Sequence, residues 1–152
     1  MRFFWLVLVL SACAPGVEVA RNADTEISTA QSSLALLDWA YLSRLEARAA
    51  VLSDGARREY VVLTYVTRID RNDPAISSAW SKGSALPYAV SDTRRVGPHR
   101  QEAGVIRLTE SAFRAALRDG LDVTLISART SHSARIPARL FGEAWRAAEP
   151  LT

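Results

Sequence analysis

The 152-residue sequence has little cysteine, histidine or lysine, and these shortages exclude several kinds of site. The single cysteine, Cys13, excludes a disulfide within the chain and any zinc or iron–sulfur site that needs two or more thiolates. The two histidines, His99 and His132, have no HExxH or equivalent spacing, so we expect no metal and no cofactor. Lys82 is the only lysine among 19 basic residues, a ratio that a GC-rich coding bias also produces.

The charge, glycine pattern and apolar content exclude further classes of protein. A net charge of +3, spread evenly along the chain, does not indicate nucleic-acid binding. The seven glycines are dispersed, and none begins a GxGxxG or GxxxxGK[ST] phosphate loop. An apolar content of 49% argues against wholesale disorder, and the length suits one compact domain.

A short apolar run begins the chain. Eight apolar residues, Phe3 to Leu10, follow Arg2. A membrane-spanning helix needs about 20 such residues, whereas this run has the length of a signal-peptide core. It ends in Leu10-Ser11-Ala12-Cys13, which resembles the lipobox of bacterial lipoproteins. The alternative is a buried cysteine in an N-terminal core helix.

The lipobox resemblance implies a covalent membrane anchor at Cys13. In that class the thiol receives a diacylglyceryl group, the peptide is cut before the cysteine, and the freed amine is acylated, commonly with palmitate. Two or three acyl chains give stable anchoring, where one gives only marginal binding. Ala14, where an aspartate would mark inner-membrane retention, favours the periplasmic face of the outer membrane if the source is a diderm.

The sequence predicts a signal peptide over 1–12, a lipidated N-terminus with a flexible tether over 13–26, and one domain over 27–150. Apolar residues at three- and four-residue steps predict a long helix over 27–52. These residues are Ile27, Ala30, Leu34, Leu37, Tyr41, Leu45 and Leu52. Residues 59–69 predict a central strand, because both alternating faces carry β-branched or aromatic side chains.

Residues 70–103 predict a long loop. Asp73-Pro74 and Gly83 suit the two ends of a short helix over 75–82, and one short strand is expected near Tyr88. Long loops in compact domains are often functional or mobile.

The C-terminal third predicts two βα-like units. A strand over 105–108 precedes a helix over 110–119, which Gly120 ends. After a strand over 121–127 and a turn over 128–133, a strand over 134–136 precedes a helix over 137–148. Four identities recur at an offset of 28, through duplication or through shared packing rules: Arg107, Phe113, Ala116 and Arg118 return as Arg135, Phe141, Ala144 and Arg146. The predicted fold is therefore α+β, with a long N-terminal helix and two βα-like units on a small mixed sheet.

Two groups of residues suggest chemistry. Asp70 and Asp73 follow the predicted central strand, where carboxylates can act as acid and base, although turn and cap roles explain both. His132 lies between two serines without a GxSxG elbow, which favours a polar turn over a catalytic dyad. We therefore expect no catalytic residue.

Two further groups suggest binding. Arg94, Arg95 and Arg100 belong to the densest basic cluster, and arginine matches oxyanions. A solvated loop explains the same cluster. Trp80 and Tyr88 are candidates for an exposed aromatic interface, with core packing as the alternative.

The sequence favours a non-enzymatic lipoprotein of unknown biochemical role that binds an envelope protein or cell-wall component. A small envelope hydrolase using Asp70, Asp73 or His132 is the first alternative. Recognition of an anionic lipid or glycan by Arg94, Arg95 and Arg100 is the second. The partner and the oligomeric state stay open.

Overall fold

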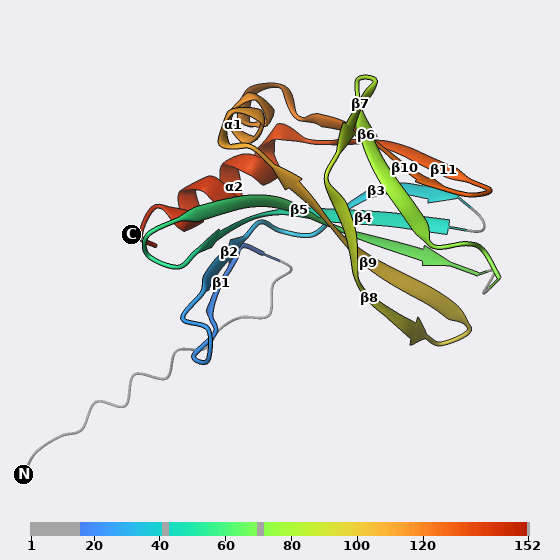
Figure 1. The fold of residues 1–152 in the computed structure, drawn as a ribbon, viewed down its shortest axis with the longest axis horizontal. Helices are drawn as coiled ribbons and strands as arrows, with labels where there is room; N and C mark the ends of the chain where they lie inside the picture. The colour runs from blue at the N-terminus through green and yellow to red at the C-terminus, as the bar shows by residue number, and fades with distance from the viewer. Residues whose placement is uncertain (1–15, 41–42, 70–71, 152) are drawn as a thin grey trace, which may run out of the picture.

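A computed structural model gives the structure of residues 16–40, 43–69 and 72–151. These residues form two antiparallel sheets, of seven and four strands, and two helices near the C-terminus (Figure 1). Both helices and the smaller sheet lie on the same side of the larger sheet (Figure 1).

The strands of the large sheet run in a fixed spatial order. That order is β1 (Glu18–Arg21), β2 (Ser28–Gln31), β4 (Ser43–Ser53), β5 (Arg58–Arg68), β9 (His99–Leu108) and β8 (Tyr88–Val96), while β3 (Ala35–Ala40) pairs with the first part of β4. The small sheet runs β11 (Ser131–Ile136), β10 (Leu121–Ser127), β6 (Ile76–Ser81) and β7 (Ser84–Leu86). The helices are α1 (Glu110–Asp119) and α2 (Ala138–Ala148).

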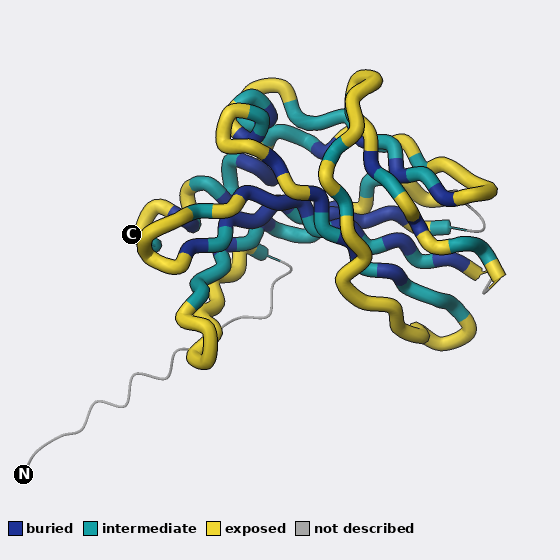
Figure 2. The backbone as a smooth tube through the Cα atoms, in the orientation of Figure 1, coloured by how far each residue is buried: buried dark blue, intermediate teal, exposed yellow. Residues whose placement is uncertain are grey.

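One core fills the space between these layers. Alternate side chains of β4 and β5 are buried against the helices and the small sheet, among them Leu45, Val51 and Val62 (Figure 2). Phe113 of α1 and Phe141 of α2 meet edge to face with ring centroids 5.1 Å apart. The predicted central strand is confirmed, because β5 lies between β4 and β9.

The predicted α+β fold with a long N-terminal helix is wrong, because residues 27–52 form β2, β3 and most of β4. Small and apolar residues of β4 alternate inward at Leu45, Ala47, Ala49 and Val51, while Arg44 and Arg48 alternate with them. A period of two is that of a strand. The three- and four-residue spacing of the leucines hid this alternation, because alanines fill half of the inward positions.

The predicted loop over 70–103 and helix over 75–82 are also wrong. The region contains β6, β7, β8 and the start of β9. Lys82 and Gly83 both have positive φ, as a two-residue type I′ hairpin turn requires. Gly97, at φ 61°, begins the two-residue turn between Val96 and His99. Gly83, Gly97 and Pro98 therefore mark hairpin turns, which resemble loop signals in sequence.

The C-terminal elements are partly confirmed. The helix over 110–119 and the strand over 121–127 are present, and the helix predicted over 137–148 begins at Ala138. The turn predicted over 128–133 is shorter, because β11 begins at Ser131. The strands that precede the two helices, β9 and β11, belong to different sheets, and every pairing is antiparallel. The prediction of two βα-like units on one mixed sheet is therefore wrong. Packing explains the repeated Phe113 and Phe141, because the two rings contact each other.

Regular structure begins inside the range expected to be a tether. β1 pairs with β2, although all four residues of β1 are exposed. Backbone hydrogen bonds hold this hairpin, so no apolar period marks it in the sequence. Cys13 and residues 1–12 lie outside the described residues.

Two glycine substitutions test the packing of β9 against β8. A Cβ at Gly104 would lie 2.6 Å from Cζ of Tyr88, too close for either group to stay in place. Overpacking of this kind costs about 1–3 kcal/mol, so Gly104→Ala should lower the free energy of unfolding by that amount. Gly142→Ala, in α2 with open space at its Cβ, should instead be neutral or stabilising by up to about 1 kcal/mol. Urea denaturation of both variants measures the difference, and equal effects would contradict the packing.

Candidate functional site

A buried ion pair joins the two sheets. Arg68 of β5 and Glu102 of β9 are each 1% exposed, and Nη2 lies 3.1 Å from Oε2. Arg68 also donates through Nη1 to the Pro74 carbonyl at 2.7 Å, and Glu102 accepts from the Ile76 amide at 2.8 Å. Pro74 and Ile76 belong to the chain that enters the small sheet at β6. The ion pair therefore attaches the start of β6, the first strand of the small sheet along the chain, to the large sheet.

Tyr88 packs beside this ion pair. Its ring lies over Gly104, and its hydroxyl interacts with Thr64 of β5. Burial, reinforced by the negative charge of Glu102, raises the pKa of Tyr88 to about 12. Tyr88 therefore faces the interior and keeps its proton at neutral pH.

The side chain of Trp80 faces solvent, unlike that of Tyr88. It alternates with the buried Ala79 on β6, is 38% exposed, and donates from Nε1 to Ser78 Oγ at 3.2 Å. The two aromatic candidates, Trp80 and Tyr88, therefore do not form one exposed patch.

The arginine candidates lie on the β8–β9 hairpin and do not all converge. Arg95 and Arg100 are directly opposite each other, whereas Arg94 lies opposite Gln101 on the other face and donates to its Oε1 at 2.8 Å. Arg100 donates to the Asp73 carbonyl at 2.6 Å and lies 3.8 Å from Glu102. Of the three, only Arg95 makes no hydrogen bond or ion pair with the described residues.

The acid–base candidates do not form a hydrogen-bonded pair among the described residues. His132 lies opposite the buried Leu125 and faces the interior, where its Nε2 is buried without a hydrogen-bond partner in the described chain. Burial, followed by the Arg68 guanidinium, lowers its pKa, so the ring is neutral at pH 7. The Asp73 carboxylate makes no hydrogen bond with a described residue, and Asp70 lies outside the described residues.

The longest exposed strand edge belongs to β8. Its nine residues pair only with β9 among the described strands, and all but Tyr88 are exposed. Val90 and Val96 are 42% and 43% exposed, and a register shift follows Val90. β8 therefore presents unpaired backbone groups, two apolar side chains and the charges of Arg94 and Arg95.

Sequence reasoning missed Arg68 and Glu102. The signal was present, because Tyr60, Val62, Thr64, Val66 and Arg68 form one alternating face of a predicted central strand. A charged residue on that face requires a buried partner. Nothing in the sequence identifies the partner as Glu102, which is 34 residues away.

No family model, curated protein or solved structure matches the chain. Within residues 16–40, 43–69 and 72–151, no helix has the length and hydropathy to cross a membrane. The same residues contain no group of three histidine, cysteine or acidic side chains suited to hold a metal ion.

Neutralising Glu102 tests the joint between the sheets. Glu102→Gln keeps an acceptor for the Ile76 amide but leaves the buried Arg68 guanidinium without its counter-charge. Breaking a buried pair in this way should lower the free energy of unfolding by about 3 kcal/mol or more. Glu110→Gln breaks an exposed pair with Arg114 and should cost less than about 1 kcal/mol. Urea denaturation measures the free energy of unfolding of both variants. Equal losses would show that the buried ion pair does not hold the two sheets together.

Proposed function

We propose that this protein is a lipid-anchored, periplasm-facing lipoprotein that binds an envelope protein without catalysing a reaction. The lipobox places the anchor at Cys13, and Ala14 favours the outer membrane. The exposed edge of β8 supports the binding role. An extended segment of a partner can add a strand there, with its backbone hydrogen-bonded to the free edge.

The strand register separates the β1–β2 hairpin from β8. β1 and β8 are at opposite ends of a path of six strands, so five spacings of about 4.8 Å place them roughly 24 Å apart across the sheet. Along the strands, the turn of the β1–β2 hairpin lies level with Ser53, whereas the end of β8 lies level with Ser43. Ten residues correspond to about 33 Å along a strand. The β8–β9 hairpin therefore lies diagonally across the large sheet from the hairpin that follows Cys13 (Figure 1).

The chemistry of β8 favours an acidic partner segment. Arg94 and Arg95 give the C-terminal half of the strand a positive charge, and side chains of opposite sign in adjacent strands attract each other. The same arginines, with the irregularity after Val90, oppose pairing between two copies of β8, because charges and bulges protect strand edges.

If the protein is anchored to the membrane, a weak interface is sufficient for it to bind its partner. A lipid holds domain and partner at one surface, which raises their effective concentration without any new contact. An interface of one added strand is consistent with such binding.

Crosslinking in cells tests the binding surface. A photo-crosslinking residue at Thr93 of β8 should form a discrete adduct with an envelope protein. Arg94→Glu combined with Arg95→Glu should reduce its yield at least fivefold, because the substitutions reverse the charge of the edge. The adduct yield is measured on blots at equal protein abundance.

The matched control reverses the same number of charges elsewhere. Arg118→Glu with Arg129→Glu changes two exposed arginines outside β8 and should leave the adduct intact. Cys13→Ser should release the protein from the membrane fraction and weaken the adduct. An adduct that survives the β8 substitutions, or disappears equally in the control, would refute β8 as the binding surface. Acylation and membrane retention of the Cys13→Ser variant would refute the anchor.

A further inference from the structure

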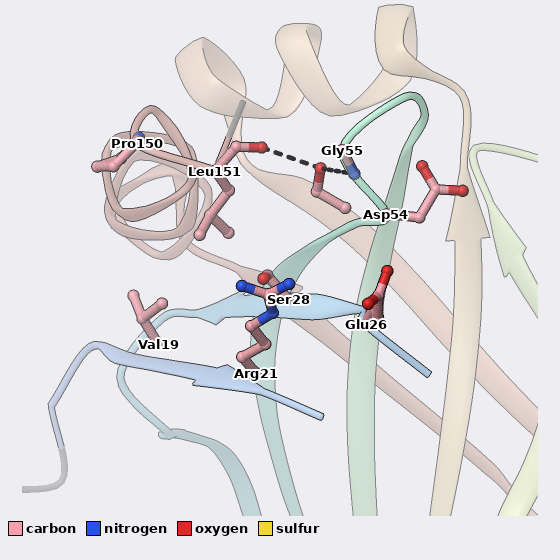
Figure 3. A pocket seen from close by; sticks show the side chains of 9 residues that line it. Val19, Arg21, Glu26, Ser28, Asp54, Gly55, Pro150 and Leu151 are labelled. Carbon is pink, nitrogen blue, oxygen red and sulfur yellow. Dashed lines mark hydrogen bonds between the residues drawn. The ribbon is translucent and has the colours of Figure 1, made fainter. Parts of the chain in front are cut away.

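A hollow of about 430 Å³ lies at the end of the large sheet that carries β1 (Figure 3). Three parts of the chain form it: the β1–β2 hairpin, the turn between β4 and β5, and the C-terminal residues after α2. Ser53 ties the last two together, because its hydroxyl donates to the Leu151 carbonyl at 3.0 Å and accepts from the Gly55 amide at 3.2 Å. The wall is therefore held by contacts between residues 98 positions apart.

Charges of both signs line the hollow without pairing. Arg21 extends its guanidinium between the two sides, with the carboxylates of Glu26 and Asp54 on one side (Figure 3). Arg21 makes no hydrogen bond or ion pair with the described residues, and no ion pair joins it to either carboxylate. One Asp54 oxygen accepts from the amides of Arg57 and Ala56, which lower the pKa of the exposed carboxyl. Asp54 is therefore held ionised in a fixed orientation.

Glu26 is placed at a cost in backbone energy. Its φ of 58° lies in the left-handed region, which glycine and asparagine adopt more readily. Turn geometry alone would favour one of those residues. We therefore explain the glutamate at this position by the hollow, which its carboxylate lines.

The other side of the hollow is apolar. Val19, Pro150 and Leu151 line it, and Val19 is 55% exposed. Val17, just before β1, is 48% exposed. Exposed valines in this position suit contact with the hydrocarbon of a membrane interface.

The hollow is close to the proposed anchor. Five residue steps separate Cys13 from Glu18, the first residue of β1, and at most about 3.6 Å per residue limits their separation to about 18 Å. This step rests on the proposed function, because only a lipid at Cys13 brings the hollow to a membrane surface.

We propose that the hollow binds the headgroup of a zwitterionic phospholipid with a primary ammonium, that is, a phosphoethanolamine group. Arg21 binds the phosphate, for which a guanidinium is suited. Glu26 and Asp54 accept hydrogen bonds from the ammonium, and Val19 and Leu151 contact the glycerol and the first methylenes. Such binding would orient the domain on the membrane, with β8 directed away from it.

A headgroup titration tests the site without requiring a membrane. The full-length protein in a phosphate-free detergent is titrated with glycerophosphoethanolamine, and the amide resonance of Gly55 is followed by NMR. We expect a saturable shift at millimolar concentration. Glycerophosphoglycerol, which has the phosphate but no ammonium, should bind at least fivefold more weakly.

Variants identify the groups that bind. Arg21→Gln and Glu26→Gln should each weaken binding at least fivefold, whereas Arg118→Gln, at an exposed arginine of α1 that does not line the hollow, should leave it unchanged. In nanodiscs, phosphatidylethanolamine should shift the Gly55 resonance more than phosphatidylcholine, whose methylated ammonium has no N–H donor.

Equal affinity for the two soluble headgroups, or an unaltered titration in Arg21→Gln, would overturn the proposal. So would the absence of a Gly55 shift with both the soluble headgroup and the nanodiscs. A Cys13→Ser variant that remains acylated in the membrane fraction would instead contradict the anchor. The two failures are distinguishable, because the soluble titration does not depend on Cys13.

Discussion

The buried pair of Arg68 and Glu102 is the interaction on which the arrangement of the two sheets depends. Removing both charges from water costs several kcal/mol per ion, and only good geometry with further hydrogen bonds offsets that cost. Here the Pro74 carbonyl and the Ile76 amide supply such bonds, and both belong to the chain that begins the small sheet. Neither sheet can move relative to the other without leaving a charge or a backbone group unsatisfied.

The same joint explains the direction of the β8–β9 hairpin. Tyr88, at the start of β8, fills the space that Gly104 leaves beside the pair, so the strand is fixed at that end. The rest of β8 extends beyond the small sheet with one edge free. The fold thereby gives the molecule two unlike ends, a mixed-charge hollow beside β1 and a cationic strand edge diagonally opposite. On our proposal, a lipid at Cys13 would turn this difference into an orientation on a membrane.

Local signals in the sequence predicted the central strand, the two C-terminal helices and the strand over 121–127. Gly120 ends α1, as predicted, and both helices bury apolar residues at helical spacing: Phe113 and Ala116 in α1, and Leu140, Phe141 and Ala144 in α2. The central strand was predictable because β-branched residues occupy both faces of β5. The long helix was wrongly predicted because β4 buries alanines, whose size carries little periodic signal, while the leucines fall at helical spacing by coincidence.

The contacts between residues far apart in the chain could not be predicted from the sequence. The pairing of Arg68 with Glu102, the opposite directions of Trp80 and Tyr88, and the divergence of Arg94 from Arg95 all depend on strand register. Register is set by the alternation of side chains and by the hairpin turns at Lys82-Gly83 and Gly97-Pro98, which resemble loop signals until the strands on both sides are known. The hollow joins three chain segments, and no motif in any one of them indicates the other two.

The central claim is that the β1 end faces the membrane and the β8 end faces away from it. It is tested most directly by fluorescence quenching from the bilayer surface. Asp24→Cys, in the β1–β2 turn, and Val96→Cys, at the end of β8, are labelled separately in the full-length lipidated protein on vesicles with a headgroup-attached quencher. The label at position 24 should be strongly quenched and the label at position 96 only weakly. Equal quenching, or stronger quenching at position 96, would contradict the orientation.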